Sequence, residues 1–305
     1  MHPFLGRVIH SYMKKIAVVC HDAGGAEIIS SWLKSNSVEF YAYLEGPALD
    51  IFKKKFKNII FNDLDTMIKD SDWLLCGTSW QSDIENIAIE IAKFYKKKSI
   101  SFLDHWVNYK ERFAYKDTYI FPDEIWVGDS IAKAIADSTF ADIEIKEMKN
   151  EYLIEMQKQL KNLEEPKRKG IKHALYVCEP IREPAKIQYG DENYFKYDEE
   201  SALKFFLDNS DLLNIDNIIL RPHPSERTEK YMWAKSYSQI PLDISSSFDL
   251  LEDIKNSDLV VGCESMAMVI ALIAKKRVIS SIPPFGRKCV LPHPEIELLS
   301  LMVND

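Results

Sequence analysis

The chain has 305 residues, of which 46% are hydrophobic, 11% aromatic and 28% charged. This composition can form the cores of about two domains and excludes a disordered or fibrous protein. Asp and Glu number 47 against 39 Lys and Arg, and the resulting net charge of −8 argues against a nucleic-acid binder that relies on bulk positive charge. The five cysteines are scattered without a C-x-x-C pair, which favours reduced thiols in a cytoplasmic protein.

The amino-terminal residues predict no membrane anchor and no secretory signal. No stretch of ~18 apolar residues is present, so no transmembrane helix is expected, although peripheral contact with a membrane stays open. Residues 1–14 are expected to form a tail, because they hold no long apolar region and Met13 begins the string MKKIAVVC, typical of a first strand after a start codon. The first twelve residues are either such a tail or a start-site artefact.

Residues 15–142 have the pattern of a first α/β domain. The apolar run at 16–20, the glycine pair that follows it and the helical pattern at 28–33 predict a strand, a tight turn and a helix. The later apolar runs and helical patterns predict strands at 38–43, 58–61, 73–76, 99–103 and 124–127 and helices at 83–95 and 130–138.

Residues 143–170 change character, and the alternation of strands and helices begins again after them. This stretch is highly charged, has a helical pattern and ends in Pro166, a basic cluster and Gly170, so it is expected to be a linker helix. Residues 171–305 then form the second domain. Its expected strands are 174–178, 217–220, 240–244, 259–261 and 277–280, and its expected helices are 199–208, 226–235, 248–255, 265–274 and 295–302.

Short apolar strands that alternate with helices indicate parallel sheets covered on both faces. The predicted fold is therefore α/β, with two Rossmann-like, doubly wound domains that face a central cleft. In such sheets ligands bind at the carboxyl ends of the strands, so polar residues directly after strands are the candidate site residues.

The string NIILRPHPSE, residues 217–226, places a histidine at such a position. Two prolines flank His223 directly after an apolar strand, and Arg221 ends that strand. A histidine there can bind a phosphate or transfer a proton near neutral pH, and the arginine can pair with the same phosphate. The alternative is a turn that happens to contain a histidine.

Two further strand ends of the second domain carry candidates for nucleotide binding. Gly262, Glu264 and Ser265 open a helix, whose amino terminus favours an anion such as phosphate; the alternative is that Ser265 or Glu264 only caps the helix. After the first strand, Glu179 could accept ribose hydroxyls and Arg182 could pair with a phosphate, unless the two form a surface ion pair.

The first domain has a glycine-bearing segment after its first strand, CHDAGGAE. It lacks G-x-G-x-x-G and G-K-[ST], so neither a dinucleotide fingerprint nor a P-loop is present. His21 and Asp22 lie beside Gly24 and Gly25, which would let a substrate approach the backbone closely. A tight turn with solvated polar residues is the alternative.

The string FLDHWVNYKERF is rich in groups that bind sugars. Asp104, His105, Trp106 and Asn108 follow a predicted strand, and an aromatic face can stack on a pyranose ring while polar groups bind its hydroxyls. The string CGTSWQSDIE, residues 76–85, has the same character. Both could instead be polar, partly buried loops.

Two such domains, with His223-Pro224 after one strand and the small-residue segment 262–265 opening a later helix, resemble GT-B glycosyltransferases. The closest resemblance is to bacterial sialyltransferases and to related capsule enzymes that use CMP-activated sugars. It implies a nucleotide sugar held mainly by the second domain, with its phosphate at His223 and Ser265. The chain departs from that pattern because it lacks an acidic pair followed by glycine and because Ser280-Ser281 follow a strand, so the base and sugar of the donor stay open.

The sequence therefore predicts an inverting, metal-independent glycosyltransferase of bacterial surface-polysaccharide assembly. Asp22 is the expected base, with Asp104 in reserve, and the nucleotide sugar is a co-substrate, so no cofactor is expected. One alternative is a UDP-sugar epimerase or a sugar-nucleotide hydrolase of the same fold, and another is a non-catalytic nucleotide-sugar-binding protein.

Overall fold

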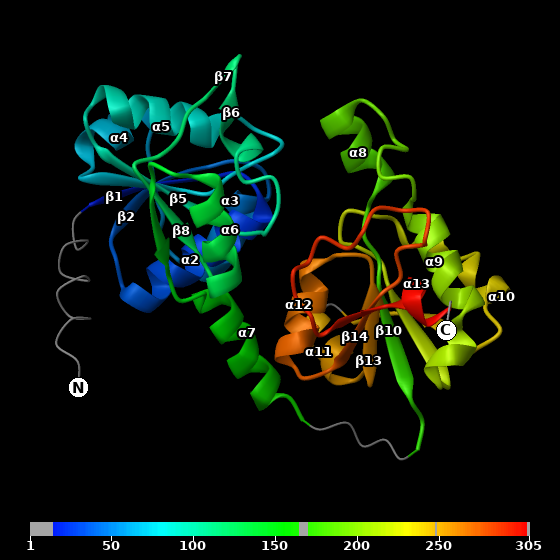
Figure 1. Cartoon of the computed structure of the whole chain (residues 1–305). Coiled ribbons are helices and arrows are strands. Elements are labelled where there is room, and N and C mark those ends of the chain that lie inside the picture. Colours follow the sequence, from blue (N-terminus) through cyan, green and yellow to red (C-terminus); the bar gives the residue numbers. More distant parts are fainter. Residues whose placement is uncertain (1–14, 165–169, 248, 304–305) are drawn as a thin grey trace. The chain divides into compact units, whose positions relative to one another are not determined.

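The computed structural model describes residues 15–164, 170–247 and 249–303. The expected tail at 1–14 lies outside the described residues, as do residues 165–169 of the expected linker. The chain divides into two compact units, an N-terminal unit that ends at Ile154 and a C-terminal unit that begins at Glu155 (Figure 1).

The N-terminal unit is built on a seven-stranded sheet, as far as its described residues show, with the order β3-β2-β1-β4-β5-β8-β9. All of the neighbouring strands in it are parallel. A separate antiparallel hairpin consists of β6 and β7. The strands are β1 (Ile16–Cys20), β2 (Phe40–Leu44), β3 (Ile60–Phe61), β4 (Trp73–Cys76), β5 (Lys98–Leu103), β6 (Ala114–Tyr115), β7 (Thr118–Tyr119), β8 (Glu124–Val127) and β9 (Glu144–Glu147).

Helices cover both faces of this sheet, because every residue of β1 is buried and neither face is left to water. Figure 1 shows α2 and α3 on one face and α4 and α5 on the other. The helices are α2 (Ala23–Asn36), α3 (Gly46–Lys55), α4 (Leu64–Asp70), α5 (Ile84–Phe94), α6 (Ser130–Thr139) and α7 (Glu151–Asn162), with a 3₁₀ turn at Glu111–Phe113.

Three tryptophans form the centre of the N-terminal core. The ring centroid of Trp32 lies 5.0 Å from that of Trp126 and 6.3 Å from that of Trp73, and the Trp73 and Trp126 centroids are 6.0 Å apart. All three side chains are buried, and they join α2 to strands β4 and β8. Edge-on and tilted packing of this kind suits the charge distribution of aromatic rings, so the cluster fixes the helix on the sheet.

The C-terminal unit repeats the design with a six-stranded sheet in its described part, in the order β12-β11-β10-β13-β14-β15. Every neighbouring pair in it is parallel. The strands are β10 (His173–Val177), β11 (Asn217–Arg221), β12 (Leu242–Ile244), β13 (Leu259–Gly262), β14 (Arg277–Ser280) and β15 (Ile296–Leu298).

The helices of this unit also lie on both faces of the sheet (Figure 1). One core joins α9, α10 and α13 to β10 and β11, through Phe206, Ala234, Leu299 and Tyr176 among others, while the apolar α12 is buried along most of its length. The helices are α8 (Arg182–Tyr189), α9 (Glu199–Asp208), α10 (Ala234–Tyr237), α11 (Leu250–Lys255), α12 (Met266–Ile273) and α13 (Leu299–Met302), with 3₁₀ turns at Ser210–Leu213 and Thr228–Tyr231.

The predicted α/β class with two parallel, Rossmann-like sheets is confirmed; the predicted cleft between the domains stays a prediction. The expected linker helix at 143–170 differs in its first part, because residues 144–147 form the edge strand β9, in which Ile145 pairs with Ile125 of β8. The helix in this stretch is α7, and the two compact units meet in the chain within it.

Two predicted helices of the C-terminal unit are wrong. Residues 226–235 form a 3₁₀ turn and the start of the short α10, because the backbone of Arg227 is extended, with a φ of −80° and a ψ of 136°, and a continuous helix cannot pass through it. Residues 296–298 at the predicted last helix form β15, since Ile296 pairs with Val278 at the sheet edge, and only α13 is helical.

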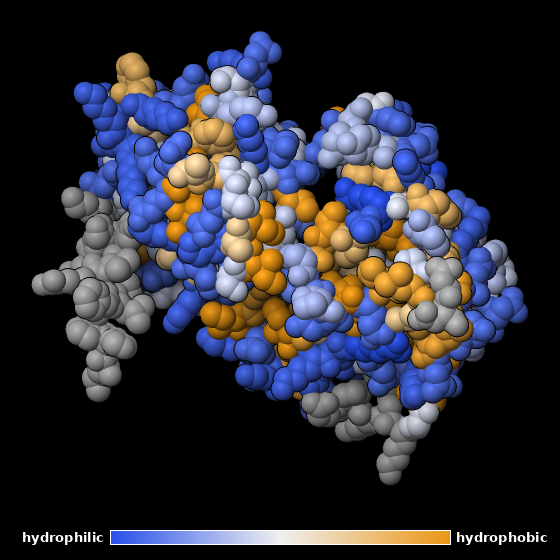
Figure 2. All heavy atoms as spheres, viewed as in Figure 1, coloured by the Kyte–Doolittle hydropathy of each residue, from blue (hydrophilic) through white to orange (hydrophobic). Residues whose placement is uncertain are grey.

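On the face that Figure 2 shows, most of the surface is hydrophilic, with hydrophobic residues in patches between. No helix among the described residues is long and apolar enough to cross a membrane.

Candidate functional site

Each sheet has a point at which the strand order reverses, and ligands of doubly wound sheets bind at the carboxyl ends of the strands there. In the N-terminal unit this point lies between β1 and β4, and in the C-terminal unit between β10 and β13. We call the residues that follow β1, β4 and β5, together with the start of α5, the N-terminal site. The residues that follow β10, β11 and β13, together with the start of α9, are the C-terminal site.

Asp22 is the best-held carboxylate of the N-terminal site. Its Oδ1 accepts a hydrogen bond from Ser79 Oγ at 2.9 Å, and its Oδ2 accepts one from the Trp80 backbone N–H at 3.0 Å. The Nδ1 atom of His21 lies 2.7 Å from Oδ1. The side chain is 24% exposed, so the carboxylate is fixed in position and still open to a ligand. Oδ2 has a single donor here, which leaves it capacity for another.

The predicted glycine turn is wrong, because Gly24 and Gly25 lie in the first turn of α2. A Cβ at Gly24 would stand 1.8 Å from Asp104 Oδ2, and one at Gly25 would stand 3.1 Å from the Cα atom of Gly77. The two glycines therefore let the amino end of α2 pack directly against the ends of β4 and β5. Gly25 is buried there, so its backbone offers no open surface to an acceptor.

Asp104, the reserve base, is paired with a buried arginine. Nη1 of Arg112 donates to Asp104 Oδ1 at 2.9 Å and to Thr78 Oγ1 at 2.9 Å, and the Arg112 side chain is only 5% exposed. Oδ1 of Asp104 is therefore occupied by the Arg112 guanidinium, whereas Asp22 pairs with no arginine or lysine among the described residues. The assignment of Asp22 as base, with Asp104 in reserve, stays a prediction.

The predicted sugar-binding segment after β5 differs in what it exposes. Trp106 is 7% exposed and its Nε1 donates to Asp129 Oδ2 at 3.0 Å, so its ring is part of the core and offers no stacking surface. Asn108 has a φ of 56° and its carbonyl accepts the Arg112 N–H, which makes it a turn residue. The half-buried His105 ring packs on Trp106 with centroids 5.5 Å apart.

Glu85 is a residue of the N-terminal site that the sequence did not single out. It is 3% exposed, and its Oε1 accepts the His21 N–H at 2.9 Å. Its Oε2 has no hydrogen-bond partner among the described residues. Burial raises the pKa of Glu85 to about 8, and the nearby carboxylates of Asp22 and Asp104 add to the rise. Glu85 lies three residues before Ala88, and both are buried on one face of α5. This helical spacing is the sequence signal that could have identified Glu85.

His223 lies at the C-terminal site, in the turn that follows β11. Its Nδ1 accepts the Ser225 backbone N–H at 3.2 Å and lies 2.7 Å from Ser225 Oγ. A backbone N–H can only donate, so Nδ1 carries the lone pair and the neutral ring holds its proton on Nε2. Burial lowers the pKa of His223 below its ordinary 6.5, although Glu226 opposes the shift. The residue is thus a neutral N–H donor near neutral pH.

Arg221, predicted to bind the same phosphate, is engaged within the fold. Its Nη1 lies 2.5 Å from Asp253 Oδ2 and 3.1 Å from the Ser247 carbonyl oxygen, and the side chain is 16% exposed. These contacts join β11 to α11. A phosphate contact by Arg221 stays a prediction, and it would have to use other nitrogens of the guanidinium.

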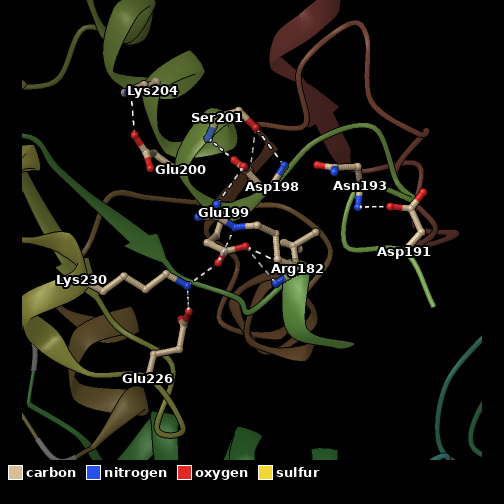
Figure 3. Close-up of polar contacts among 11 residues, drawn as sticks. Arg182, Asp191, Asn193, Asp198, Glu199, Glu200, Ser201, Lys204, Glu226 and Lys230 are labelled. Atoms are coloured by element: carbon tan, nitrogen blue, oxygen red, sulfur yellow. Dashed lines mark hydrogen bonds and ion pairs between the residues drawn. The ribbon is translucent and has the colours of Figure 1, made fainter. Parts of the chain in front are cut away.

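A charged network ties the segment after β10 to the segment after β11 (Figure 3). Glu199, at the start of α9, accepts the backbone N–H groups of Ile181 at 3.3 Å and Arg182 at 3.2 Å, and Lys230 binds both Glu199 and Glu226. Burial alone would raise the pKa of Glu199, but the Lys230 ammonium and the backbone N–H groups outweigh it and hold the pKa at about 2.

Arg182 lies at the edge of that network. Its Nε is 3.4 Å from Glu199 Oε1 and its Nη1 is 3.6 Å from Asp198 Oδ2, so both contacts are long. The side chain is 40% exposed. The predicted contact of Arg182 with an anion stays a prediction.

The segment around the start of α12 is already satisfied by the protein. Ser265 Oγ accepts the Ala267 N–H at 3.2 Å as a helix cap, and the buried Glu264 pairs with Arg287 and accepts the Val290 N–H at 3.2 Å. The Ser265 contact is that of the capping alternative, whereas Glu264 does not cap the helix and binds Arg287 and Val290 instead. The phosphate contacts predicted for Glu264 and Ser265 stay predictions.

Glu179 and Gly262 lie at the carboxyl ends of β10 and β13, beside the start of α12. Oε2 of Glu179 accepts the Glu264 N–H at 3.0 Å, just before α12, and burial raises the pKa of Glu179 to about 7 although Arg287 lowers it. A Cβ at Gly262 would stand 2.7 Å from Val177 Cγ2. Gly262 therefore lets β13 and β10 end side by side, which is a packing role.

Comparison with solved structures matches the chain over most of its length. The glycotransferase of kitacinnamycin aligns with 88% of this chain and 80% of its own, at 10% identity and a TM-score of 0.50. A putative UDP-N-acetylglucosamine 2-epimerase from Listeria monocytogenes aligns with 87% of this chain and 78% of its own, at 10% identity and a TM-score of 0.54. The fold is GT-B-like. At these identities the likeness shows the fold alone.

The wall teichoic acid polymerase TagF is a third match, covering 87% of this chain and 70% of its own at 15% identity and a TM-score of 0.38. Neither known protein families nor curated protein sequences give a match to the chain. The resemblance to sialyltransferases is thus not supported beyond the GT-B-like fold.

Proposed function

We propose that this protein is an inverting glycosyltransferase that moves a sugar from a nucleotide-activated donor, with a CMP-sugar favoured, to a carbohydrate acceptor in surface-polysaccharide assembly. The observation that carries the proposal is the state of His223 in a GT-B-like fold. Its Nδ1 is occupied by the Ser225 N–H, so Nε2–H is available to a phosphate oxygen at the carboxyl end of β11.

In the proposed reaction the acceptor hydroxyl gives its proton to the Asp22 carboxylate. The hydroxyl oxygen forms a bond to the anomeric carbon of the donor sugar, and the bond from that carbon to the phosphate oxygen breaks. The electron pair stays on the leaving phosphate, where the His223 Nε2–H stabilises the developing charge. Asp22 suits its part because it is held by Ser79 and Trp80 and, among the described residues, pairs with no lysine or arginine, unlike Asp104.

The alternative is an epimerase or hydrolase of a UDP-sugar. The observation in its favour is the likeness to a putative UDP-N-acetylglucosamine 2-epimerase, whose TM-score of 0.54 is as high as that of the glycotransferase. Such an enzyme needs no acceptor. Steady conversion of a sugar nucleotide without any acceptor present would favour it over the transferase, whereas slow donor hydrolysis alone would not.

The phosphate contact is tested by measuring nucleotide binding with and without the histidine. CMP, UDP, GDP and dTDP are added to the wild-type protein in a thermal unfolding assay, where a ligand at 100 times its Kd stabilises the fold by about 2.7 kcal/mol. The nucleotide that stabilises most identifies the donor class. His223→Ala should weaken its binding by roughly tenfold or more, since a hydrogen bond to a charged group contributes about 1.5–3 kcal/mol.

A matched control is His173→Ala, which removes a half-buried histidine from the amino end of the same sheet, where it contacts Asn217. This variant should bind the nucleotide as the wild type does. If a folded His223→Ala protein binds the nucleotide with unchanged affinity, the proposed role of His223 is wrong. If none of the four nucleotides stabilises the wild-type protein, the proposed function is wrong.

A further inference from the structure

Trp80 is an exposed aromatic residue four positions after the end of β4, in the N-terminal site. The residue is 37% exposed, and its backbone N–H donates to Asp22 Oδ2 at 3.0 Å. Other exposed aromatic residues of this unit lie elsewhere, with Phe94 at the end of α5 and Tyr119 in the β6–β7 hairpin. The backbone of Trp80 thus lies beside the carboxylate that we propose as the base, and its indole ring lies against the guanidinium of Arg112.

The protein holds this ring in place. The guanidinium carbon of Arg112 lies 5.4 Å from the ring centroid, and Arg112 is itself buried and fixed by Asp104 and Thr78. The chain on either side of the ring is fixed as well, because Ser79 Oγ binds Asp22 and accepts the Gln81 N–H at 3.1 Å. A ring that is already ordered loses little entropy when a ligand covers it.

We infer that Trp80 is the stacking surface for a hexopyranose acceptor, an inference that rests on the proposed function for the existence of an acceptor sugar. The apolar C–H face of a pyranose packs on an aromatic ring, while its hydroxyls point outward from the ring edge. Asp22 Oδ2, which has a single donor among the described residues, is the neighbouring group able to accept from such a hydroxyl. The buried Trp106 cannot serve in this way.

The charge of the surroundings selects a sugar over a nucleotide as the stacked ligand. Asp22 and Asp104 both belong to this site, and its arginine is paired with Asp104. Carboxylates accept hydrogen bonds from sugar hydroxyls, but they repel the phosphates of a nucleotide. Stacking of a nucleobase on Trp80 is the competing outcome, and the test includes it.

The inference is tested first by binding, without a donor. Tryptophan emission of the full chain is recorded while methyl β-D-glucopyranoside, methyl β-D-galactopyranoside or methyl N-acetyl-β-D-glucosaminide is added, with the acyclic polyol sorbitol as a comparison. At least one glycoside should change the emission of the wild type, and neither sorbitol nor CMP should do so in the same way. The change should be absent in Trp80→Phe, which lacks the reporting indole.

Kinetics then separate stacking from a structural role. Once a donor and an acceptor are identified, Trp80→Ala should raise KM for the acceptor about tenfold, because stacking and buried area are lost. The Kd of the donor nucleotide should stay unchanged. Trp80→Phe, which keeps an aromatic ring, should have a KM close to that of the wild type. Phe94→Ala, at an aromatic residue of greater exposure outside the site, should change neither quantity.

The inference is overturned if no glycoside changes the wild-type emission, if Trp80→Phe shows the same change as the wild type, or if CMP alone gives the change. Failure of the proposed function is a different result, in which no nucleotide stabilises the protein. The glycoside titration contains no nucleotide, so each result can be obtained without the other.

Discussion

Each of the two sites has one carboxyl group that accepts a backbone N–H from a neighbouring loop, and the two sites differ in where that group comes from and in its exposure, since Glu85 is buried and Glu179 is half-buried. In the N-terminal site Glu85 reaches from α5 to accept the His21 N–H after β1. In the C-terminal site Glu179 follows β10 directly and accepts the Glu264 N–H before α12. The pKa is raised by burial to about 8 for Glu85 and to about 7 for Glu179.

The nearest charges act in opposite directions on the pKa values of these two carboxyl groups. Arg287 lowers the pKa of Glu179 against the effect of burial, whereas Asp22 and Asp104 raise that of Glu85 further. The N-terminal site is thus a group of carboxylates whose arginine is already paired, and the C-terminal site combines acids with a neutral histidine donor and partly exposed cations. The N-terminal site can accept hydrogen bonds from the hydroxyls of the proposed acceptor. The C-terminal site can donate hydrogen bonds to the phosphate of the proposed donor.

The largest expected effect is on the base of the N-terminal site. Asp22→Asn should lower kcat by on the order of 10²–10⁴, because a positioned general base is lost, and should leave donor affinity unchanged. Steady-state kinetics with a donor titration measure both quantities.

Asp104→Asn provides the comparison within the same site. It should reduce stability more than turnover, because Arg112 loses its charged partner inside the protein, at a cost of about 1–3 kcal/mol. Full turnover in both variants would show that the base lies elsewhere.

The second prediction concerns the pH dependence of stability. Below about pH 4.5 Glu85 is protonated in folded and unfolded chains alike, and between pH 4.5 and about 8 only the folded chain keeps the proton. The unfolded state then binds fewer protons, so the free energy of unfolding falls as pH rises through this window. Glu85→Gln removes that fall, and it should gain stability relative to the wild type by on the order of a few kcal/mol from pH 4.5 to pH 8.5.

Glu179→Gln should show the same trend with an earlier limit, near pH 7, and a smaller total. Chemical denaturation at each pH gives the free energies. The exposed Glu90 lies on the same helix as Glu85, and Glu90→Gln is the control for the substitution itself. A pH-independent difference between Glu85→Gln and the wild type would mean that Glu85 is not buried as described.

The smallest expected effect is that of Gly24→Ala. The added methyl group meets Asp104 Oδ2, so either α2 or the Asp104–Arg112 pair must shift, at a cost of about 1–3 kcal/mol of unfolding free energy. Ala23→Ser, at the exposed neighbouring position, should cost far less. Equal stability of the two variants would show that α2 does not need close contact with β5.

Much of the fold could be predicted because buried parallel strands are short apolar runs. The runs at 73–76, 124–127 and 277–280 begin and end where the strands do, and His223 follows a strand as expected. The positions directly after the strands could therefore be located from the sequence. What the sequence did not show is which of the side chains at these positions are exposed and which are paired within the fold.

Exposure and side-chain pairing decide that ranking, and both depend on residues distant in the chain. Trp80 and Trp106 each follow a strand among polar neighbours, but Asp129 binds the indole of Trp106 and the core buries it. The glycines of α2 resemble a turn until the approach of Asp104 and Gly77 is known. Arg221 could not be seen to pair with Asp253, which is 32 residues later.

The tryptophan cluster of the N-terminal core gives the protein a natural optical label. Five of the six tryptophans precede Ile154, and Trp233 is the sixth. Rings as close as Trp32, Trp73 and Trp126 couple their electronic transitions, which produces a near-ultraviolet circular dichroism signal that vanishes when the cluster separates. Loss of this signal therefore reports melting of the first unit, while the far-ultraviolet signal reports both, and unfolding of the two halves can be followed separately without attaching a dye.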